Sequence, residues 1–488
     1  MASWTSSLSK LSFTVVSLAS IGHAYINYAN DFVSPNYVLS NNFSNTTIPA
    51  QQTILAWADQ SAQGGPWSVT TKPYLAPSGD IHDYMSWAPY AWPNCSNVDN
   101  TTELTPQEVW SECIYYTRDG QFNPDGRAVN NVGDFDSLAN AVLFNSLAWA
   151  INGSDSYAQR VAQYINTWFI ANSTYMNPNL NYAQMQRGIY GQNGTHTGVL
   201  DLKCMAKIAS GVLVLRQGKA QSWTSDIDSQ FQSWLQEYIT WMTTNTLALQ
   251  EKAATNNHGS FYFNQLASLQ ILVDDLDGAN KTLQEYFTGI YVNQINTNGD
   301  QASTLLTHKY YAVLIRLYSL WNRSVQGLTT TTNARLAEYV GWSAWNHTTK
   351  TNTTIKNAAD YAMLQSAGSE TASELYPDVA AVGAVYGDPT GSYAAWLKAA
   401  ENSSYVADAT FFWDQPLGDS GYAAQLEAAA SASASATASG SKSTSAGGVK
   451  TEHSGALSLV RQDATWARWI MYYTVFSLLI AGSLVESW

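Results

Sequence analysis

The sequence predicts an all-α protein built as one large domain, from about Tyr25 to about Leu426. Apolar residues recur with the 3.6-residue period of a helix along most of the middle of the chain, whereas strand signals are few. Consecutive helices of this length pack as antiparallel pairs, so many of them in one domain suggest a ring of helical hairpins. With 488 residues, 45% of them hydrophobic, the chain can bury a large core.

The expected helices follow one another along the chain. Ser154 or Asp155 can cap a helix whose apolar face runs to Trp168, and an apolar segment precedes it. The next apolar faces lie in the ranges 227–242, 283–287, 336–340, 355–362 and 393–397. The range 72–93 differs, because it is dense in proline, glycine and aromatic residues and lacks a helical period. It is either an ordered loop that lines a site or a buried strap across the domain.

Both ends of the chain predict export to the cell surface. Residues 1–24 have the pattern of a signal peptide, with Lys10 before an apolar run and Ala24 at the expected cleavage site. Residues 427–453 are rich in Ser and Ala and predict a flexible, O-glycosylated stalk. Residues 454–488 combine small residues, a spacer and a final apolar run, which predicts either a glycolipid-anchor signal or a single membrane helix. Contact with a membrane is expected through this segment alone.

N-glycosylation sequons and cysteines agree with an oxidising, extracellular setting. Twelve sequons begin at Asn42, Asn45, Asn94, Asn100, Asn152, Asn172, Asn193, Asn280, Asn322, Asn346, Asn352 and Asn402. Of the three cysteines, Cys95 and Cys113 are the preferred disulfide pair because they close a short loop, which leaves Cys204 unpaired. The cysteines lack a matching histidine cluster, so neither a zinc site nor any other metal or cofactor is expected.

The charge of the chain limits its partners. The net charge is −14 and the sequence pI is about 4.8, which speaks against binding to nucleic acid. Aromatic residues make up 13% of the chain, and their flat faces suit sugar rings, although they also fill cores. An acidic protein can still bind an anionic polymer if its cleft is locally positive or rich in neutral donors.

The stretch from Thr255 to Tyr262 is the strongest candidate for a functional site. It places two amides, Asn256 and Asn257, beside the imidazole of His258. An amide donor next to a histidine can hold a carboxylate while the proton on the neighbouring carbon is removed. The alternative is that the asparagines cap a helix and that His258 is an ordinary surface histidine.

Six stretches of this chain resemble motifs of the alginate lyase-like family in the same order along the chain. They are HDYMSWAPYAWP (82–93), YTRDGQFNP (116–124), NPNLNYAQ (177–184), HTGVLD (196–201), NNHG (256–259) and the helix 355–363. The resemblance runs from about Ser68 to Met363. It implies an incomplete (α/α) toroid and lyase activity on a uronate polymer such as alginate or glucuronan.

The resemblance also implies roles for particular residues. Asn257 and His258 would neutralise the substrate carboxylate, and His258 is also a candidate base. The family generally uses a tyrosine as the acid, and Tyr310 and Tyr311 are the candidates here. The candidate substrate-binding residues are Asn256, Gln184, Tyr84, Tyr90, Trp92 and Tyr262. Several residues also have a structural alternative. Gln184 could be a buried amide tied to the backbone, and Tyr90 and Trp92 could pack in the core. His196 either lines the cleft or caps a helix.

The sequence departs from the family pattern around the candidate tyrosines. The arginine that the family places before its tyrosine is absent between Gln301 and Tyr311, where Lys309 is the nearest positive charge. From Ala312 to Thr332 the sequence no longer follows the family. Three explanations of this departure stay open: a retained intron, a genuine insertion, or a degenerate, inactive site.

Three functions are weighed from the sequence. The first is a surface-anchored, monomeric lyase whose partner is an anionic polysaccharide. The second is an (α/α) glycoside hydrolase, which needs two separated carboxylates, and no such pair stands out. The third is a non-catalytic cell-wall protein that binds polysaccharide, which the missing arginine and the serine-rich stalk favour.

Overall fold

The computed structural model describes residues 31–99, 104–118, 120–189, 191, 193–301, 319–366, 375–401 and 404–414. All of them belong to one compact unit. The expected signal peptide, the stalk, the C-terminal anchor segment, Tyr310 and Tyr311 lie outside these residues.

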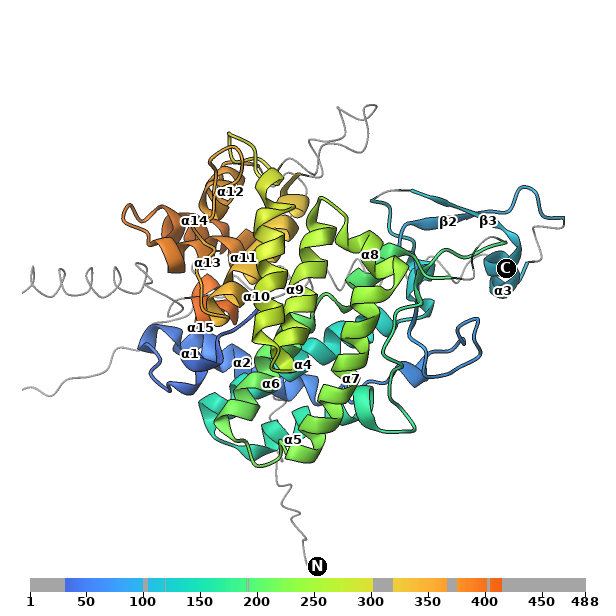
Figure 1. Ribbon diagram of the computed structural model, residues 1–488, viewed down its shortest axis with the longest axis horizontal. Coiled ribbons are helices and arrows are strands. Elements are labelled where there is room, and N and C mark those ends of the chain that lie inside the picture. Colours follow the sequence, from blue (N-terminus) through green and yellow to red (C-terminus); the bar gives the residue numbers. More distant parts are fainter. Residues whose placement is uncertain are drawn as a thin grey trace, which may run out of the picture. The chain divides into compact units, whose positions relative to one another are not determined.

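The described part of the chain is mainly helical (Figure 1). Its α-helices are α1 (Pro35–Leu39), α2 (Ile48–Ser61), α3 (Pro106–Glu112), α4 (Asn131–Asn152), α5 (Asp155–Ile165), α6 (Met205–Gly218), α7 (Ser225–Thr244), α8 (Thr246–Lys252), α9 (Asn257–Leu272), α10 (Leu276–Thr288), α11 (Ser319–Tyr339), α12 (Ile355–Met363), α13 (Tyr376–Tyr386), α14 (Ser392–Glu401) and α15 (Thr410–Asp414). The prediction of an all-α fold of the (α/α) toroid type is confirmed. Among the described residues, no helix combines the length and the apolar character needed to cross a bilayer.

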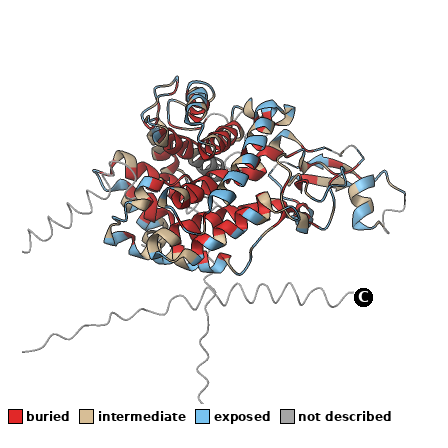
Figure 2. Cartoon of the chain, turned by 60° about the horizontal axis from the view of Figure 1, so that its bottom comes forward, coloured by how far each residue is buried: buried red, intermediate tan, exposed pale blue. Residues whose placement is uncertain are grey.

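Buried residues gather in the interior of the helical part of the chain (Figure 2). Helices α4, α6 and α9 form the centre of the core. Helix α6 packs against both of the others, and α9 continues the contacts to α10 and α11. Every residue of α6 from Met205 to Leu215 is buried, as expected for a helix surrounded by other helices. The small residue Gly211 allows α6 to approach α4 closely, because a Cβ there would lie 2.9 Å from the Ser146 hydroxyl and from a methyl group of Val142.

Two short sheets accompany the helices. Strands β1 (Met85–Trp87) and β4 (Tyr182–Met185) pair in parallel, and β2 (Ala91–Asn94) and β3 (Ile114–Thr117) pair antiparallel. The buried-strap alternative for the range 72–93 holds in part, and the site-lining alternative stays a prediction. Tyr84 to Trp87 form a buried strap, whereas Tyr90 is exposed at the start of the β2–β3 hairpin.

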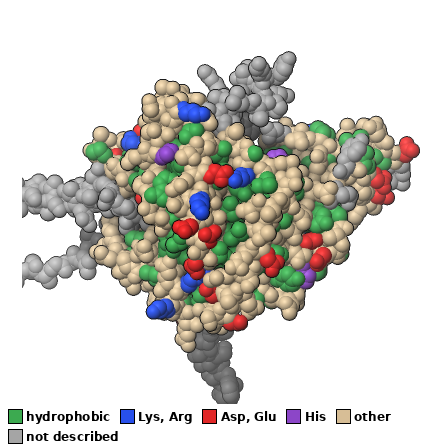
Figure 3. Space-filling model, in the orientation of Figure 1, with side chains coloured by type: hydrophobic (Ala, Val, Ile, Leu, Met, Phe, Trp, Pro, Cys, Tyr) green, Lys and Arg blue, Asp and Glu red, His purple; other side chains and the backbone are tan. Residues whose placement is uncertain are grey.

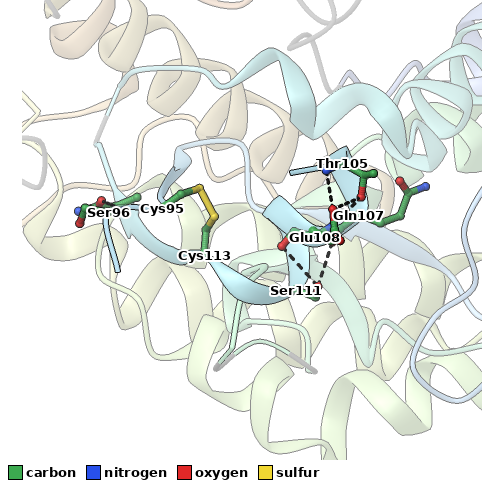
Figure 4. Close-up of a disulfide and its surroundings, with 8 residues drawn as sticks. Cys95, Ser96, Thr105, Gln107, Glu108, Ser111 and Cys113 are labelled. Carbon is green, nitrogen blue, oxygen red and sulfur yellow. Dashed lines mark hydrogen bonds between the residues drawn. A yellow bond between two sulfur atoms is a disulfide. The ribbon is translucent and has the colours of Figure 1, made fainter. Parts of the chain in front are cut away.

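The disulfide joins the ends of the β2–β3 hairpin (Figure 4). Cys95 follows Asn94 and Cys113 precedes Ile114, and these two neighbours are partners in the strand register. The bridge therefore continues the ladder by one residue pair and closes the loop that carries α3. This confirms the predicted pairing, and Cys204 is a buried free thiol.

Three arginines near the hairpin stack on aromatic rings. The guanidinium of Arg187 is buried between the rings of Trp87 and Tyr115, at 4.5 and 4.8 Å from their centroids, and none of its nitrogens has a hydrogen-bond partner among the described residues. Arg118 lies over the ring of Trp92 and Arg127 over that of Phe122. These contacts are cation–π interactions, in which the flat guanidinium faces the ring.

A buried charge cluster ties both ends of the described chain to α11. Arg335 pairs with Asp31, the first described residue, and with Asp414, the last. Both carboxylates and the guanidinium are buried, and the indole nitrogen of Trp413 donates to Asp31 at 3.3 Å. Burial pushes the pKa of Asp414 upward, and the positive charge of Arg335 opposes that shift.

A further buried carboxyl, Asp378, lies near this cluster. It accepts a hydrogen bond from the Thr331 hydroxyl at 3.3 Å, and its other oxygen has no partner among the described residues. Burial raises the pKa of Asp378 well above its ordinary value. The protonated form is therefore favoured in the folded protein.

Replacing Arg335 by Met should destabilise the protein by about 3–5 kcal/mol, because it leaves two buried carboxylates without their cation. The free energy of unfolding in urea measures this cost. The matched control is Arg160→Met, since Arg160 pairs with the exposed Asp59 and should cost about 1 kcal/mol or less. Equal losses in the two variants would contradict the assignment of Arg335 as the main charge anchor of the fold.

The Asp378→Asn variant should become more stable than the native chain as the pH rises. The pKa of Asp378 is raised on folding, so above about pH 4 the unfolded chain releases this proton first and the native protein loses stability. Asparagine carries no such proton and removes that loss. Melting temperatures of both proteins at about pH 5 and about pH 8 test this, and a difference that does not change with pH would refute it.

Candidate active site

The site is built around one buried carboxylate, that of Glu251 near the end of α8. Its side chain is 0% exposed. The Nδ1 atom of His196 donates a hydrogen bond to its Oε2 at 2.6 Å, and the Nδ1 atom of His258 lies 3.0 Å from its Oε1. The second contact has the distance of an ion pair, but its N–H direction is not aligned for a hydrogen bond. Two histidines from different elements thus share one acid.

The start of α9 fixes the position of His258. Asn256 is the N-cap, and its side-chain oxygen accepts a hydrogen bond from the backbone N–H of His258 at 3.1 Å. The amide of Gln294 donates to the carbonyls of Thr255 and Asn256, at 3.3 Å each. Gly259 is required here because a Cβ would lie 2.1 Å from the carbonyl oxygen of Ala254. The helix-cap alternative therefore holds for Asn256, and this cap also orients the candidate catalytic residue His258.

Asn257 occupies the first turn of α9 and is half-buried. Within the described part of the chain, its side-chain amide makes no hydrogen bond. It lies where the backbone N–H groups of a helix N-terminus attract negative charge. An amide in this place can donate to a carboxylate without losing a bond to any of the described residues.

Gln184 is held in a strained backbone conformation close to His196. Its φ angle is +47°, in the left-handed region that costs a non-glycine residue about 1–3 kcal/mol. Its backbone N–H donates to the Ser86 hydroxyl at 2.7 Å, and its side-chain amide donates to Asp201 at 2.8 Å. The hydroxyl of Thr195, the residue before His196, donates to its carbonyl at 3.1 Å. Strain of this kind is found at functional sites, where the surrounding structure enforces it.

Asp201 organises this second group of polar residues. It is buried, and burial raises its pKa. Its carboxyl accepts hydrogen bonds from Gln184, Ser86 and Tyr84. The neighbouring 3₁₀-helix His196–Leu202 packs against α8, which joins Asp201 to the element that carries Glu251.

Two predicted substrate contacts, Tyr84 and Tyr262, are wrong. Each side chain is 1% exposed. The hydroxyl of Tyr84 donates to Asp201 at 3.0 Å and that of Tyr262 to the carbonyl of Met242 at 2.9 Å. Burial raises the pKa of both phenols. Their rings support the site from inside the core and offer no face to a polysaccharide.

Tyr90 precedes β2 and Trp92 lies within it, and both reach the surface. Tyr90 is 39% exposed, and the half-buried Trp92 donates its indole N–H to the carbonyl of Gln121 at 2.8 Å. The structure thus brings together Asn256, Asn257, His258 and Gln184 with His196 and Glu251, while Tyr90 and Trp92 belong to the hairpin. Glu251 was not identified in the sequence, and its isolated position gives no motif by which to find it.

The chemistry available at this site is that of neutral donors and imidazoles. In the described ranges, no group of three or more His, Cys, Asp or Glu side chains is arranged to hold a metal ion. On the face shown in Figure 3, charged side chains are sparse among polar and apolar ones. A helix N-terminus that carries an amide–imidazole pair can neutralise a carboxylate and stabilise the negative charge that develops beside it.

Comparison with known proteins gives the family. The chain belongs to the alginate lyase family, whose model matches residues 68–372. A solved alginate lyase from Bacteroides ovatus is 23% identical, with a TM-score of 0.65 over 78% of this chain and 96% of that one. Alginate lyase A1-III from Sphingomonas species A1 is 12% identical, with a TM-score of 0.40 over 69% of this chain and 77% of that one. No curated protein matches the chain.

Replacing Gln184 by Gly should separate strain from function. Glycine accepts a positive φ without strain, which offsets the lost hydrogen bond to Asp201, so the free energy of unfolding should change by less than about 1 kcal/mol. If Gln184 contacts the substrate as predicted from the sequence, activity should fall by about tenfold or more. Thermal unfolding and initial rates on polyuronates measure the two effects.

Lys219→Gly is the matched control for this substitution. Lys219 also has a positive φ, +56°, but lies at the C-terminal end of α6. Its replacement should leave activity unchanged. If Gln184→Gly also retained full activity, the strained glutamine would have only a structural role.

Proposed function

We propose that this chain cleaves a 4-linked polyuronate of the alginate or glucuronan type by β-elimination. The observation that carries the proposal is the pair Asn257–His258 at the N-terminus of α9, set beside the buried carboxylate of Glu251. The family match over residues 68–372 supports the same class of reaction.

The arrangement suits the first step of such an elimination. The negative charge of a uronate carboxylate must be neutralised before the proton on C5 can leave. The free amide of Asn257 and the positive end of α9 can both act on that carboxylate. Donors fixed in place before the reaction stabilise the charge that develops as the proton is removed.

The orientation of His258 determines what its ring can do. Its Nδ1 atom faces Glu251, so Nε2 is the atom available to a substrate. In the neutral form with hydrogen on Nδ1, Nε2 accepts and can take the C5 proton. In the doubly protonated form, Nε2–H donates and can neutralise the carboxylate.

The acid that protonates the O4 leaving group remains a prediction. Tyr310 or Tyr311 is proposed for this step, since a phenol with an ordinary pKa of about 10 keeps its proton at neutral pH. A phenol that also acts as the base needs a nearby positive charge to lower its pKa. Lys309 is the nearest candidate in the sequence, and weak activity is expected from the chain as written.

The site favours elimination over hydrolysis. An inverting glycoside hydrolase needs two carboxyl groups on opposite sides of the scissile bond, about 6.5–9.5 Å apart. The carboxyl groups at this site, Glu251 and Asp201, are both buried and already hydrogen-bonded inside the protein. A polysaccharide-binding protein without catalysis would bind the same polymers but release no product.

Ultraviolet absorbance during incubation with a panel of polyuronates should rise on at least one of them, because only elimination creates a double bond conjugated to the carboxylate. His258→Ala should lower kcat/KM by about 10²–10³-fold without unfolding the protein. The control is His347→Gln, whose ring lies against Phe287 and Tyr291. Binding without any absorbance change in the native chain would support the non-catalytic function instead.

We also propose that the protein is exported and held at the cell surface by its C-terminal segment. The support is the apolar N-terminal run, the sequons, and the stalk followed by a final apolar stretch in the sequence. A chain truncated after Gly448 should appear folded and soluble in the medium, whereas the full chain should fractionate with membranes. Retention of the truncated chain on membranes would exclude this anchor.

A further inference from the structure

We propose that Glu251 is a positioning residue for two substrate-facing imidazoles, and that His196 acts on the substrate carboxylate together with His258. This inference rests on the proposed lyase function and adds two residues to its site. It assigns to Glu251 the task of directing one edge of each histidine ring toward the substrate.

The carboxylate of Glu251 has the two histidines as its contacts within the described residues. It is fully buried, with one oxygen toward each ring. The adjacent Lys252 turns elsewhere and pairs with Glu285 at 2.7 Å. A buried carboxylate is costly unless donors or positive charge compensate it. His196 supplies a hydrogen bond to Oε2, and His258 lies at ion-pair distance from Oε1.

Hydrogen-bond chemistry then fixes which ring atoms face outward. A carboxylate only accepts, so a nitrogen that bonds to it must carry hydrogen. Each histidine presents Nδ1 to Glu251, which leaves its Nε2 on the opposite edge. The histidine side chains are 46% and 30% exposed, for His196 and His258, while the acid between them is inaccessible. The protein thus buries the acid and exposes parts of the two rings.

The second imidazole also lies beside the strained amide. His196 follows Thr195, which bonds to the backbone carbonyls of both Ala183 and Gln184. Contacts through Thr195 and Glu251 therefore connect the strained glutamine to both imidazoles, in the order Gln184, His196, Glu251 and His258. A row with an imidazole on each side of a carboxylate offers a substrate two nitrogen atoms instead of one.

The charge balance of the group gives His196 a distinct task. When one imidazole is doubly protonated, its charge offsets that of Glu251 and the group is neutral. The group becomes positive only when the second imidazole is protonated as well. A second imidazole beside Glu251 thus offers the site a second nitrogen donor that one imidazole alone cannot supply.

The test compares Glu251→Gln and His196→Gln with the control Glu285→Gln, which removes an exposed carboxylate next to Lys252. Glutamine keeps the volume of Glu251 but offers one acceptor and one donor, so at most one ring can keep Nδ1–H bonded to it. We expect Glu251→Gln to lower kcat by about 10²-fold or more while KM changes by less than about threefold. His196→Gln should lower kcat/KM by about 10–100-fold, and the control should match the native chain.

Nitrogen-15 NMR of the imidazoles provides a readout that does not depend on turnover. Spectra of His196→Gln and His258→Gln assign the two signals. In the native chain both rings should carry hydrogen on Nδ1, and in Glu251→Gln at least one should change its tautomer or lose this bond. Addition of an oligouronate should shift both signals.

Failure of this inference differs from failure of the proposed function. If no polyuronate is cleaved by the native chain but both rings show Nδ1–H and shift with oligouronate, the positioning role stands and the lyase function fails. If His258→Ala is inactive while His196→Gln and Glu251→Gln keep rates within about threefold of the native chain, the inference is overturned. A native spectrum in which either ring lacks hydrogen on Nδ1 overturns it as well.

Discussion

The buried pairing of Arg335 with Asp31 and Asp414 is the interaction on which the rest of the fold depends. It anchors the two ends of the described chain on α11, and α11 in turn packs on α9. On the same helix, the amide of Asn333 donates to the carbonyl of Ser260 in the first turn of α9, at 3.2 Å. The charge cluster therefore supports the helix whose N-terminus presents His258.

The site owes its geometry to polar groups inside the core. Gln294, Asp201 and Glu251 are all buried, and each uses its side chain to hold a residue that faces outward. Polar groups in such places rigidify a protein when they are fully satisfied and destabilise it when they are not. The core of this protein thus combines apolar packing around α6 with a polar scaffold behind α9. Tyr84 and Tyr262 belong to this scaffold, which explains why they are buried.

The sequence predicted the features that depend on local patterns. Helical periodicity gave the fold class, the short spacing of Cys95 and Cys113 gave their pairing, and the asparagine before His258 gave the helix cap. Features that depend on tertiary packing were not accessible. Periodicity could not show that α9 is buried on nearly all sides, so Tyr262 was assigned to the substrate although its ring is enclosed. Glu251 lies on a separate short helix, and its relation to His196 and His258 exists only in the folded chain.

The exposed arginines of the hairpin region bear on how an anionic polymer approaches the protein. The chain carries a net charge of −14, which slows the approach of any polyanion. Arg118 and Arg127 are exposed, lie over aromatic rings and form no ion pair with a carboxylate in the described ranges, whereas Arg187 is buried. An anionic chain that reaches this edge meets two exposed guanidinium groups, and added salt shortens the range over which they act.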